Sequence, residues 1–229
     1  MHLNEPEYAN KGLTLIRMPE EFEGEFAIPE GVREIADSAF IHCTNLTAVI
    51  LPTTLERIGE YAFKLCKSLE SIDISDSVTE IGRNAFWMCH SLSKVKLSAS
   101  LSKIESETFR ETAIEEIEIP NNVKLIEDQA FGDCYYLQDI QLPNDIEIAD
   151  SAFEGCGGLT AVDAVYLDLY GNPHYKLVEV FPHAFHYSIP DDVVEIGNNV
   201  LKDCVNIDSV VVPDSVKKIT SYTIVSMCE

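Results

Sequence analysis

Seven cysteines are the residues in this chain best suited to chemistry, because thiols can pair, bind metal or act as nucleophiles. Six of them recur at the same offset of a repeated segment: Cys43, Cys66, Cys89, Cys134, Cys156 and Cys204. That regularity favours a buried column of reduced thiols over stacked disulfides or a metal site. Cys228 is displaced by one residue from this offset, where Met227 stands, so we expect an exposed thiol there.

The histidines form no pattern that indicates a metal or catalytic site. The sequence contains no C-x-x-C pair, and we expect His183 and His186 to lie in a loop without an acidic or thiol partner close by. His42 precedes Cys43 whereas His90 follows Cys89, so no Cys–His pair keeps one geometry. Nucleophile-elbow, phosphate-loop and calcium-loop motifs are also absent from the sequence. We therefore predict no catalytic residues, no cofactor, no metal and no enzyme.

The elements that position these residues come from an internal repeat. Equivalent stretches begin at Pro29, Pro52, Ser75, Ser98, Pro120, Pro143, Pro190 and Pro213. The step from Pro29 to Pro52 is 52−29 = 23 residues, and most other steps have the same length. Each copy carries an aliphatic residue and an Ile, and most also carry an A-F-x-x-C stretch and a closing L-x-x-V-x-L run. Such a period predicts a solenoid in which each repeat forms one coil.

The two ends of the repeat predict different local structures. The closing V-x-L run alternates with period two, which is typical of a short strand with one face inward. The A-F-x-x-C stretch has the three-residue spacing of a helical turn, so we expect it on the opposite side of each coil. Stacking would then place Phe on Phe and Cys beside Cys, with a parallel sheet along one side.

The pattern resembles the BspA-type leucine-rich repeat, from about Pro29 to Glu229. The resemblance implies an α/β leucine-rich-repeat solenoid, with a parallel β-sheet on the concave side, short helical turns on the convex side and β-hairpin insertions. It also implies a protein-interaction module, specifically a cell-surface or secreted adhesion or host-interaction protein. Residues 1–10 contain no signal peptide, so a cytoplasmic protein and a mature exported chain both remain open.

Departures from the period predict the chain's subdivisions. The fourth copy has Thr112 in the Cys slot and lacks one residue before Ile114. Two apolar runs around Gly171–Pro173 predict a β-hairpin, and the Asn10–Gly12 segment repeats that signal near the N-terminus. We expect an N-terminal hairpin cap over residues 1–28, repeats 1–6 over 29–164, a hairpin insertion over 165–189 and repeats 7–8 over 190–229. All four parts are expected to form one continuous solenoid domain.

The expected site lies on the outward face of the closing strands. Residues that flank the inward Val should face out of the concave sheet, where solenoids usually bind. The candidate ligand-binding residues are Asp73, Lys94, Lys96, Glu116, Glu118, Asp139, Gln141 and Asp163. A rival site is the hairpin's tyrosines, Tyr166, Tyr170, Tyr175 and Tyr187, because tyrosine is enriched at interfaces.

The charge narrows the class of partner. Sixteen Lys and Arg against 39 Asp and Glu give a formal net charge of −23. So acidic a surface repels phosphate backbones and anionic lipids, which argues against nucleic acid, and no apolar run is long enough to insert into a membrane. We expect a protein partner with a basic surface. The alternatives are a solvated face without a ligand and a structural spacer, and the sequence does not indicate an oligomeric state.

Overall fold

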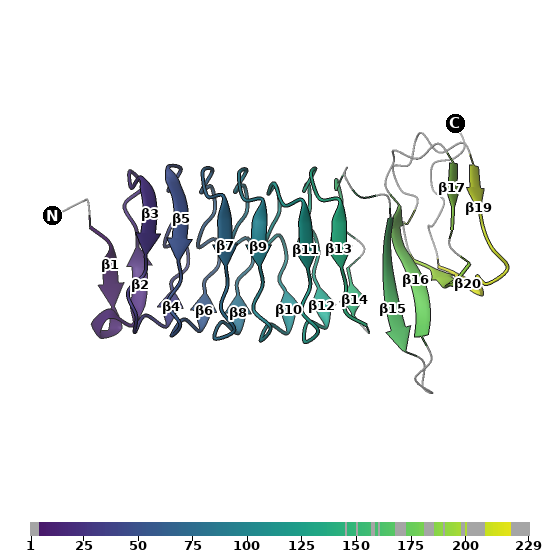
Figure 1. Ribbon diagram of the computed structural model, residues 1–229, viewed down its shortest axis with the longest axis horizontal. Coiled ribbons are helices and arrows are strands. Elements are labelled where there is room, and N and C mark those ends of the chain that lie inside the picture. Colours follow the sequence, from purple (N-terminus) through teal and green to yellow (C-terminus); the bar gives the residue numbers. More distant parts are fainter. Residues whose placement is uncertain are drawn as a thin grey trace.

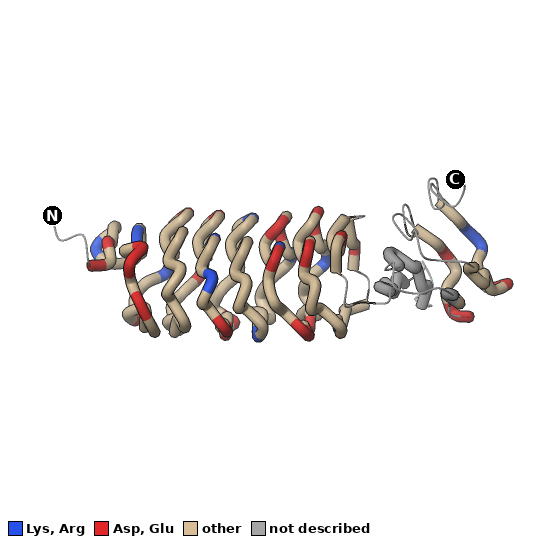
Figure 2. Tube along the Cα trace, turned by 90° about the horizontal axis from the view of Figure 1, so that it is seen from above, with Lys and Arg blue, Asp and Glu red and all other residues tan. Residues whose placement is uncertain are grey.

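Each repeat forms one coil, and the coils stack along a nearly straight axis (Figures 1 and 2). The computed structural model describes residues 5–144, 146–149, 151–156, 159, 161–167, 173–180, 186–189, 191–197, 200 and 209–220. The side chains of residues 161–167, 173–180, 186 and 187 lie outside the described set. We number the coils by their residues: coil 0 is 14–28, coil 1 is 29–51, coil 2 is 52–74, coil 3 is 75–97, coil 4 is 98–119 and coil 5 is 120–142.

Two rows of parallel strands run along the column. The L-x-x-V-x-L runs form the row that we call the long-strand face: β3 (Gly24–Ala27), β5 (Leu46–Ile50), β7 (Ser71–Asp73), β9 (Lys94–Lys96), β11 (Glu116–Glu118) and β13 (Asp139–Gln141). The segments around the Ile that recurs at the same position of each repeat form the short-strand face. Its strands are β2 (Thr14–Arg17), β4 (Glu34–Ile35), β6 (Arg57–Ile58), β8 (Glu80–Ile81), β10 (Lys103–Ile104), β12 (Leu125–Ile126) and β14 (Glu147–Ile148). The strands pair in register, so each coil repeats the position of the one before it.

The third side of each coil, which we call the turn side, corrects one expectation. The A-F-x-x-C stretch forms successive turns and no helix, and the one helical element among the described residues is the short 3-10 turn η1 (Asn10–Gly12). In coil 1 the Phe40 N–H donates to Ala62 O of the next coil at 2.7 Å, whereas the Cys43 N–H donates to Phe40 O at 3.1 Å. An α-helix needs every N–H to bond four residues back within its own segment. Because alternate N–H groups here bond to the next coil, the helical half of the α/β expectation is wrong, and the fold is a parallel β-solenoid.

The turn side also holds non-glycine residues in the left-handed region of backbone space. Two positions in each coil do so, one just before the buried Ala–Phe pair and one just before the Cys slot. In coils 1 to 5 these residues are Ser38, His42, Tyr61, Leu65, Asn84, Met88, Glu107, Glu111, Gln129 and Asp133. This conformation costs side-chain-bearing residues free energy. Their N–H groups bond to the neighbouring coil, as Ser38 N–H does to Glu60 O at 2.8 Å, and these bonds offset the strain.

The core is a stack of phenylalanine rings between the three sides. Phe40, Phe63, Phe86, Phe109, Phe131 and Phe153 are all fully buried. Neighbouring centroids lie 4.7–5.5 Å apart, and the interplanar angles run from 2° to 15°. Stacked aromatic pairs add stabilisation beyond their buried area. The predicted stacking of Phe on Phe is therefore confirmed along the whole described series.

The predicted column of reduced cysteines is confirmed for the five that are described, which are free and buried. Their thiols also bridge coils: Cys66 Sγ lies 3.1 Å from Phe40 O, and Cys89 Sγ lies 3.0 Å from Phe63 O. Burial raises the pKa of the Cys43 thiol to about 12 and that of Cys66 further still. Both thiols therefore keep the proton that they donate. Cys204 and Cys228 lie outside the described residues.

Antiparallel hairpins begin two arrays of coils. β1 (Glu7–Ala9) pairs with β2, which continues into the short-strand face. β15 (Ala161–Leu167) pairs with β16 (Pro173–Val180) in the same way. The second array then repeats the two rows with four further strands: β17 (His186–Ser188), β18 (Val193–Ile196), β19 (Ser209–Val211) and β20 (Lys218–Ile219). Its rows are β16-β18-β20 and β17-β19. The exact boundaries of cap, repeats and insertion remain a prediction.

Candidate functional site

The long-strand face presents seven of the eight predicted site residues to solvent. Their strands show alternating burial, with Ile72 and Ile117 inward and their neighbours outward. Asp73, Lys94, Lys96, Glu116, Glu118, Asp139 and Gln141 are all exposed. The strand register aligns Lys96 with Asp73 and Asp139 with Glu116. Because the column is nearly straight, the face is not the concave inside of a horseshoe (Figure 1).

Asp163, the eighth residue, is not brought into this row. β15 contains it and belongs to the sheet of β16, β18 and β20, whereas β13 pairs with β11. Its side chain lies outside the described set, as do those of the hairpin tyrosines Tyr166, Tyr170, Tyr175 and Tyr187. The exposed row that holds the other seven residues therefore ends at β13.

Charges on the long-strand face are mostly unpaired. Lys96 Nζ lies 2.9 Å from Asp73 Oδ1, and the two side chains are 71% and 70% exposed. Within residues 5–144, all of which are described, Glu116, Glu118 and Asp139 have no ion-pair or side-chain hydrogen-bond partner. Three adjacent carboxylates thus face solvent with no cation within ion-pair distance, although Lys96 lines the same groove.

Grooves mark the same surface. The largest one that includes the carboxylates has a volume of about 640 Å³ and is lined by Lys96, Glu116, Glu118, Asp139 and Gln141 among others. A second groove of about 360 Å³ lies between β7 and β9, and a third of about 540 Å³ reaches back to β5. The face is therefore hollowed along most of its length, which gives a partner side chain places to lie.

Three polar residues that line the groove of about 640 Å³ were not among the predicted site residues. Asp76, Asn121 and Asn122 lie in the loops that follow the long strands. Asp76 Oδ1 accepts the Ala99 N–H at 2.8 Å, and Asn122 Nδ2 donates to Ala99 O at 2.7 Å. These residues could have been predicted from their place in the repeat. They come just after its first residue, Ser75 or Pro120, and therefore just after a strand of the long-strand face.

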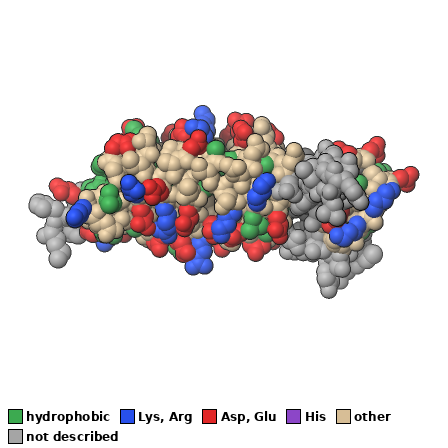
Figure 3. Space-filling model, turned by 90° about the horizontal axis from the view of Figure 1, so that it is seen from below, with side chains coloured by type: hydrophobic (Ala, Val, Ile, Leu, Met, Phe, Trp, Pro, Cys, Tyr) green, Lys and Arg blue, Asp and Glu red, His purple; other side chains and the backbone are tan. Residues whose placement is uncertain are grey.

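The short-strand face and the turn side contrast with this surface, because many of their carboxylates are paired, although Glu147 on β14 has no ion-pair partner among the described residues. Arg57 contacts three of them: Glu34 at 2.6 Å, Asp37 at 3.1 Å and Glu80 at 3.2 Å. Lys103 joins Glu105 to Glu127 in the same manner. Figure 3, the view from below, shows basic and acidic side chains interleaved along the column. Ion pairs on these sides connect neighbouring coils.

No metal or membrane-spanning feature adds to the site. Among the described residues, no group of three or more His, Cys, Asp or Glu is arranged to hold a metal ion. No helix in the described part of the chain is long and apolar enough to cross a membrane.

Comparison with known proteins supports the fold. The sequence profile of the BspA type leucine rich repeat region matches in six copies, over residues 23–138 and 103–228. No curated protein matches the chain. Such repeat proteins are generally protein-interaction or surface repeat proteins, and their solenoids are typically non-enzymatic scaffolds.

Solved structures with the same fold come from several bacteria. A leucine rich cell surface protein from Faecalibacterium prausnitzii is similar with a TM-score of 0.63 and 24% identity, over 93% of this chain and 70% of that one. A leucine rich repeat protein from T. pallidum gives 0.59 and 25%, over 69% and 88%. The pneumococcal vaccine antigen PcpA gives 0.55 and 18%, over 84% and 51%. With these folds and the profile match over most of its length, the chain belongs to the BspA-type leucine-rich repeat family.

Proposed function

We propose that this chain is a protein-interaction module whose long-strand face binds a protein with a basic surface. The observation that carries the proposal is the group of unpaired carboxylates, Glu116, Glu118 and Asp139, around the groove of about 640 Å³. A cationic partner would supply the counter-charge that the chain itself supplies elsewhere, and complementary potentials raise both association rate and specificity.

The cellular role that we propose is adhesion or host interaction at a cell surface or in secreted form. The family is typically surface-associated, which favours this compartment. The F. prausnitzii neighbour is described as a cell surface protein, and the likeness to it at 24% identity concerns the fold.

Charge reversal tests the face. Glu116→Lys, Glu118→Lys and Asp139→Lys together raise the net charge by six, from −23 to −17. A matched control makes the same change at Glu7, Glu23 and Glu147, which are exposed and lie off the long-strand face. Both variants and the native chain are immobilised and exposed to extracellular-matrix and cell-surface extracts at low and high salt.

The proposal expects a partner that the native and control chains retain and the face variant loses, with retention weakened by salt. The retained protein is then purified and its affinity for all three chains is measured. Equal affinity for the face variant and the control would overturn the proposal. Retention of no protein by the native chain would favour a spacer role instead.

A further inference from the structure

One seam between coils differs from its neighbours on both strand faces. The long-strand face divides into the sheets β3-β5-β7-β9 and β11-β13, and the short-strand face divides into β1-β2-β4-β6-β8 and β10-β12-β14. Both divisions fall between coils 3 and 4. Neighbouring coils 2 and 3, and 4 and 5, are paired on both faces.

Two backbone bonds that join other coils are missing at this seam. On the short-strand face, Gly82 N–H donates to Ile58 O at 2.9 Å and Glu127 N–H to Ile104 O at 3.0 Å. Glu105, the equivalent residue of coil 4, makes no such bond within the fully described stretch 5–144. On the long-strand face, Ser93 N–H donates to Glu70 O at 3.0 Å and Gln138 N–H to Glu115 O at 2.8 Å.

In coil 4 the residue equivalent to Ser93 and Gln138 is Glu115. Within the fully described stretch 5–144, its N–H has no acceptor in coil 3. The other seams have these backbone bonds, and each one that is missing here removes stabilisation from the contact between coils 3 and 4. On the two strand faces, coils 3 and 4 thus lack the backbone pairing that the other adjacent coils within residues 29–142 have. The corner between the faces still crosses the seam through Ser98 Oγ, which donates to Val78 O at 2.6 Å, and through Asp76, which accepts from Ala99 N–H at 2.8 Å and from Ser100 Oγ at 2.7 Å.

The sequence of coil 4 departs from the repeat beside the break on the long-strand face, whereas β8 and β10 keep the ordinary step of 103−80 = 23 residues. The period of coil 4 is one residue short, so β11 follows β9 by 117−95 = 22 residues, measured between Val95 and Ile117. Thr112 replaces the bridging cysteine, and its Oγ1 donates to Phe109 O of its own coil at 2.8 Å. On the coil 3 side, the buried Asn84 Nδ2 has no hydrogen-bond partner.

On the turn side the backbone bonds across the same seam are kept, although the side-chain bond from the Cys slot to the preceding coil is lost. Phe86 N–H donates to Thr108 O at 2.8 Å and Met88 N–H to Arg110 O at 3.0 Å, both from coil 3 to coil 4. The rings of Phe86 and Phe109 remain stacked at 5.4 Å. The turn side therefore provides a fixed edge beside two strand faces that lack paired backbones.

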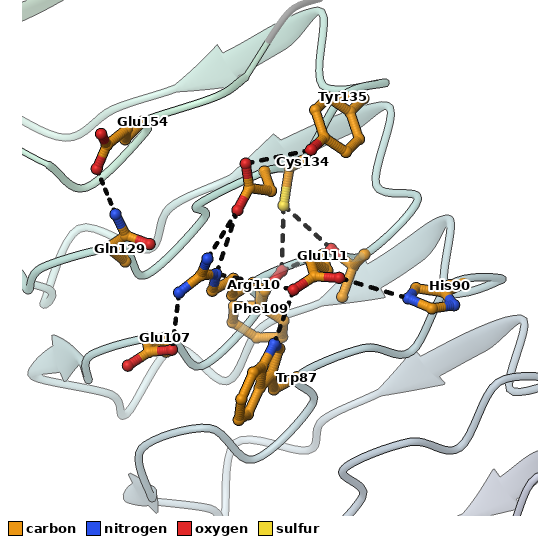
Figure 4. Close-up of polar contacts among 12 residues, drawn as sticks. Trp87, His90, Glu107, Phe109, Arg110, Glu111, Gln129, Cys134, Tyr135 and Glu154 are labelled. Atoms are coloured by element: carbon orange, nitrogen blue, oxygen red, sulfur yellow. Dashed lines mark hydrogen bonds and ion pairs between the residues drawn. The ribbon is translucent and has the colours of Figure 1, made fainter.

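A side-chain network reinforces this edge (Figure 4). Trp87 Nε1 donates to Glu111 Oε1 across the seam at 3.1 Å, and His90 Nε2 lies 3.7 Å from Glu111 Oε2. Lys64 of coil 2 covers the Trp87 ring at 4.0 Å from its centroid. Arg110 carries the network on to Asp133 of coil 5 at 3.0 Å.

We propose that the seam between coils 3 and 4 is a hinge, which pivots on the turn side and changes the width of the groove on the long-strand face. The groove of about 640 Å³ is lined by Val95–Leu97 of coil 3 and Glu116–Glu118 of coil 4, so it straddles the seam. Hinges absorb motion at a few positions while the bodies on either side stay packed. Coils 0–3 and coils 4–5 are those bodies. The hinge is independent of what the face binds.

Paired spin labels test the hinge by measuring distance distributions in the full chain. Labels replacing Ala48 and Glu116 span three coils and cross the seam, whereas labels replacing Glu25 and Lys94 span three coils without crossing it. A third pair at Lys67 and Tyr135 crosses the seam beside the turn side. Cys204 and Cys228 are replaced by Ser so that labels attach only at the introduced cysteines.

The hinge predicts a crossing distribution on the long-strand face broader by about 2 Å or more than the non-crossing one, and a narrow distribution beside the turn side. Equal widths for the first two pairs would overturn it, and so would equal broadening on both sides of the column. Thr112→Cys, combined with one Asn inserted after Ala113 to restore the 23-residue period, should narrow the crossing distribution. Thr112→Cys alone is the milder variant if the insertion prevents folding.

Discussion

The two strand faces of the first array share one core and one strand direction, yet they differ in whether their carboxylates have ion-pair partners. On the short-strand face, Arg57 contacts Glu34, Asp37 and Glu80, so its carboxylates lie beside a cation. On the long-strand face, Glu116, Glu118 and Asp139 have no such partner in the described stretch 5–144. The net charge of −23 is therefore neutralised to different extents on the two faces, and this difference is the reason for proposing the long-strand face as the binding surface.

The largest expected effect tests whether both faces depend on the same core. Phe86→Ala opens a cavity in the middle of the ring stack, where Phe86 is fully buried between Phe63 and Phe109. We expect a loss of about 3–5 kcal/mol in the free energy of unfolding, measured by urea denaturation. Phe86→Leu keeps much of the volume and should lose less. Unchanged stability of Phe86→Ala would contradict a shared core.

A smaller effect compares one cation from each face. Arg57→Met leaves three carboxylates of the short-strand face without their common cation, and we expect a loss of about 1 kcal/mol in unfolding free energy at low salt. Lys96→Met removes a single exposed ion pair, with Asp73, and should leave the thermal midpoint unchanged. If both variants lost stability equally, the distinction between the two faces would fail.

The smallest effect concerns acid. Burial raises the pKa of Glu127, but hydrogen bonds from Lys103 and Ser106 outweigh it, so the pKa lies below its ordinary value of 4.5. A lowered carboxyl pKa stabilises the fold above the unfolded value and loses that contribution as pH falls through the folded value. Glu127→Gln should therefore be less stable than the native chain at pH 7, with the difference shrinking below about pH 4.5.

Denaturation curves of native protein and Glu127→Gln at several pH values measure this difference. A gap that is constant with pH would show that the loss comes from packing and not from the charge of Glu127. Glu7→Gln, at an exposed carboxylate off the short-strand row β4 to β14, controls for the loss of a single negative charge.

Much of the fold could be predicted from the sequence, because its period fixes which residues share a layer. The buried Phe and Cys positions and the outward strand residues follow from offsets that repeat in every coil. The turn geometry did not follow, since the three-residue spacing of A-F-x-x-C fits a helical turn and a series of overlapping turns equally well. Hydrogen bonds to the neighbouring coil, such as that of Phe40 N–H to Ala62 O, decide between them.

The candidate site was predictable in part. Alternation along each strand places Glu116 and Glu118 outward, and register places Asp139 beside them. Their lack of partners could not be predicted, since it depends on where the lysines and arginines of other coils point. Asp163 was misplaced because the stretch that carries it forms the hairpin strand β15 and does not extend the row of β11 and β13.

The unpaired carboxylates of the long-strand face are proposed to attract basic partners. The most direct measurement is an amide chemical-shift titration of the full chain with an oligo-lysine peptide, at low and high salt. We predict salt-sensitive shifts concentrated on β11, β13 and the loop after β7, with the Glu116, Glu118 and Asp139 charge-reversed variant showing none there. Shifts spread evenly over both strand faces, or centred on the short-strand face, would contradict the account.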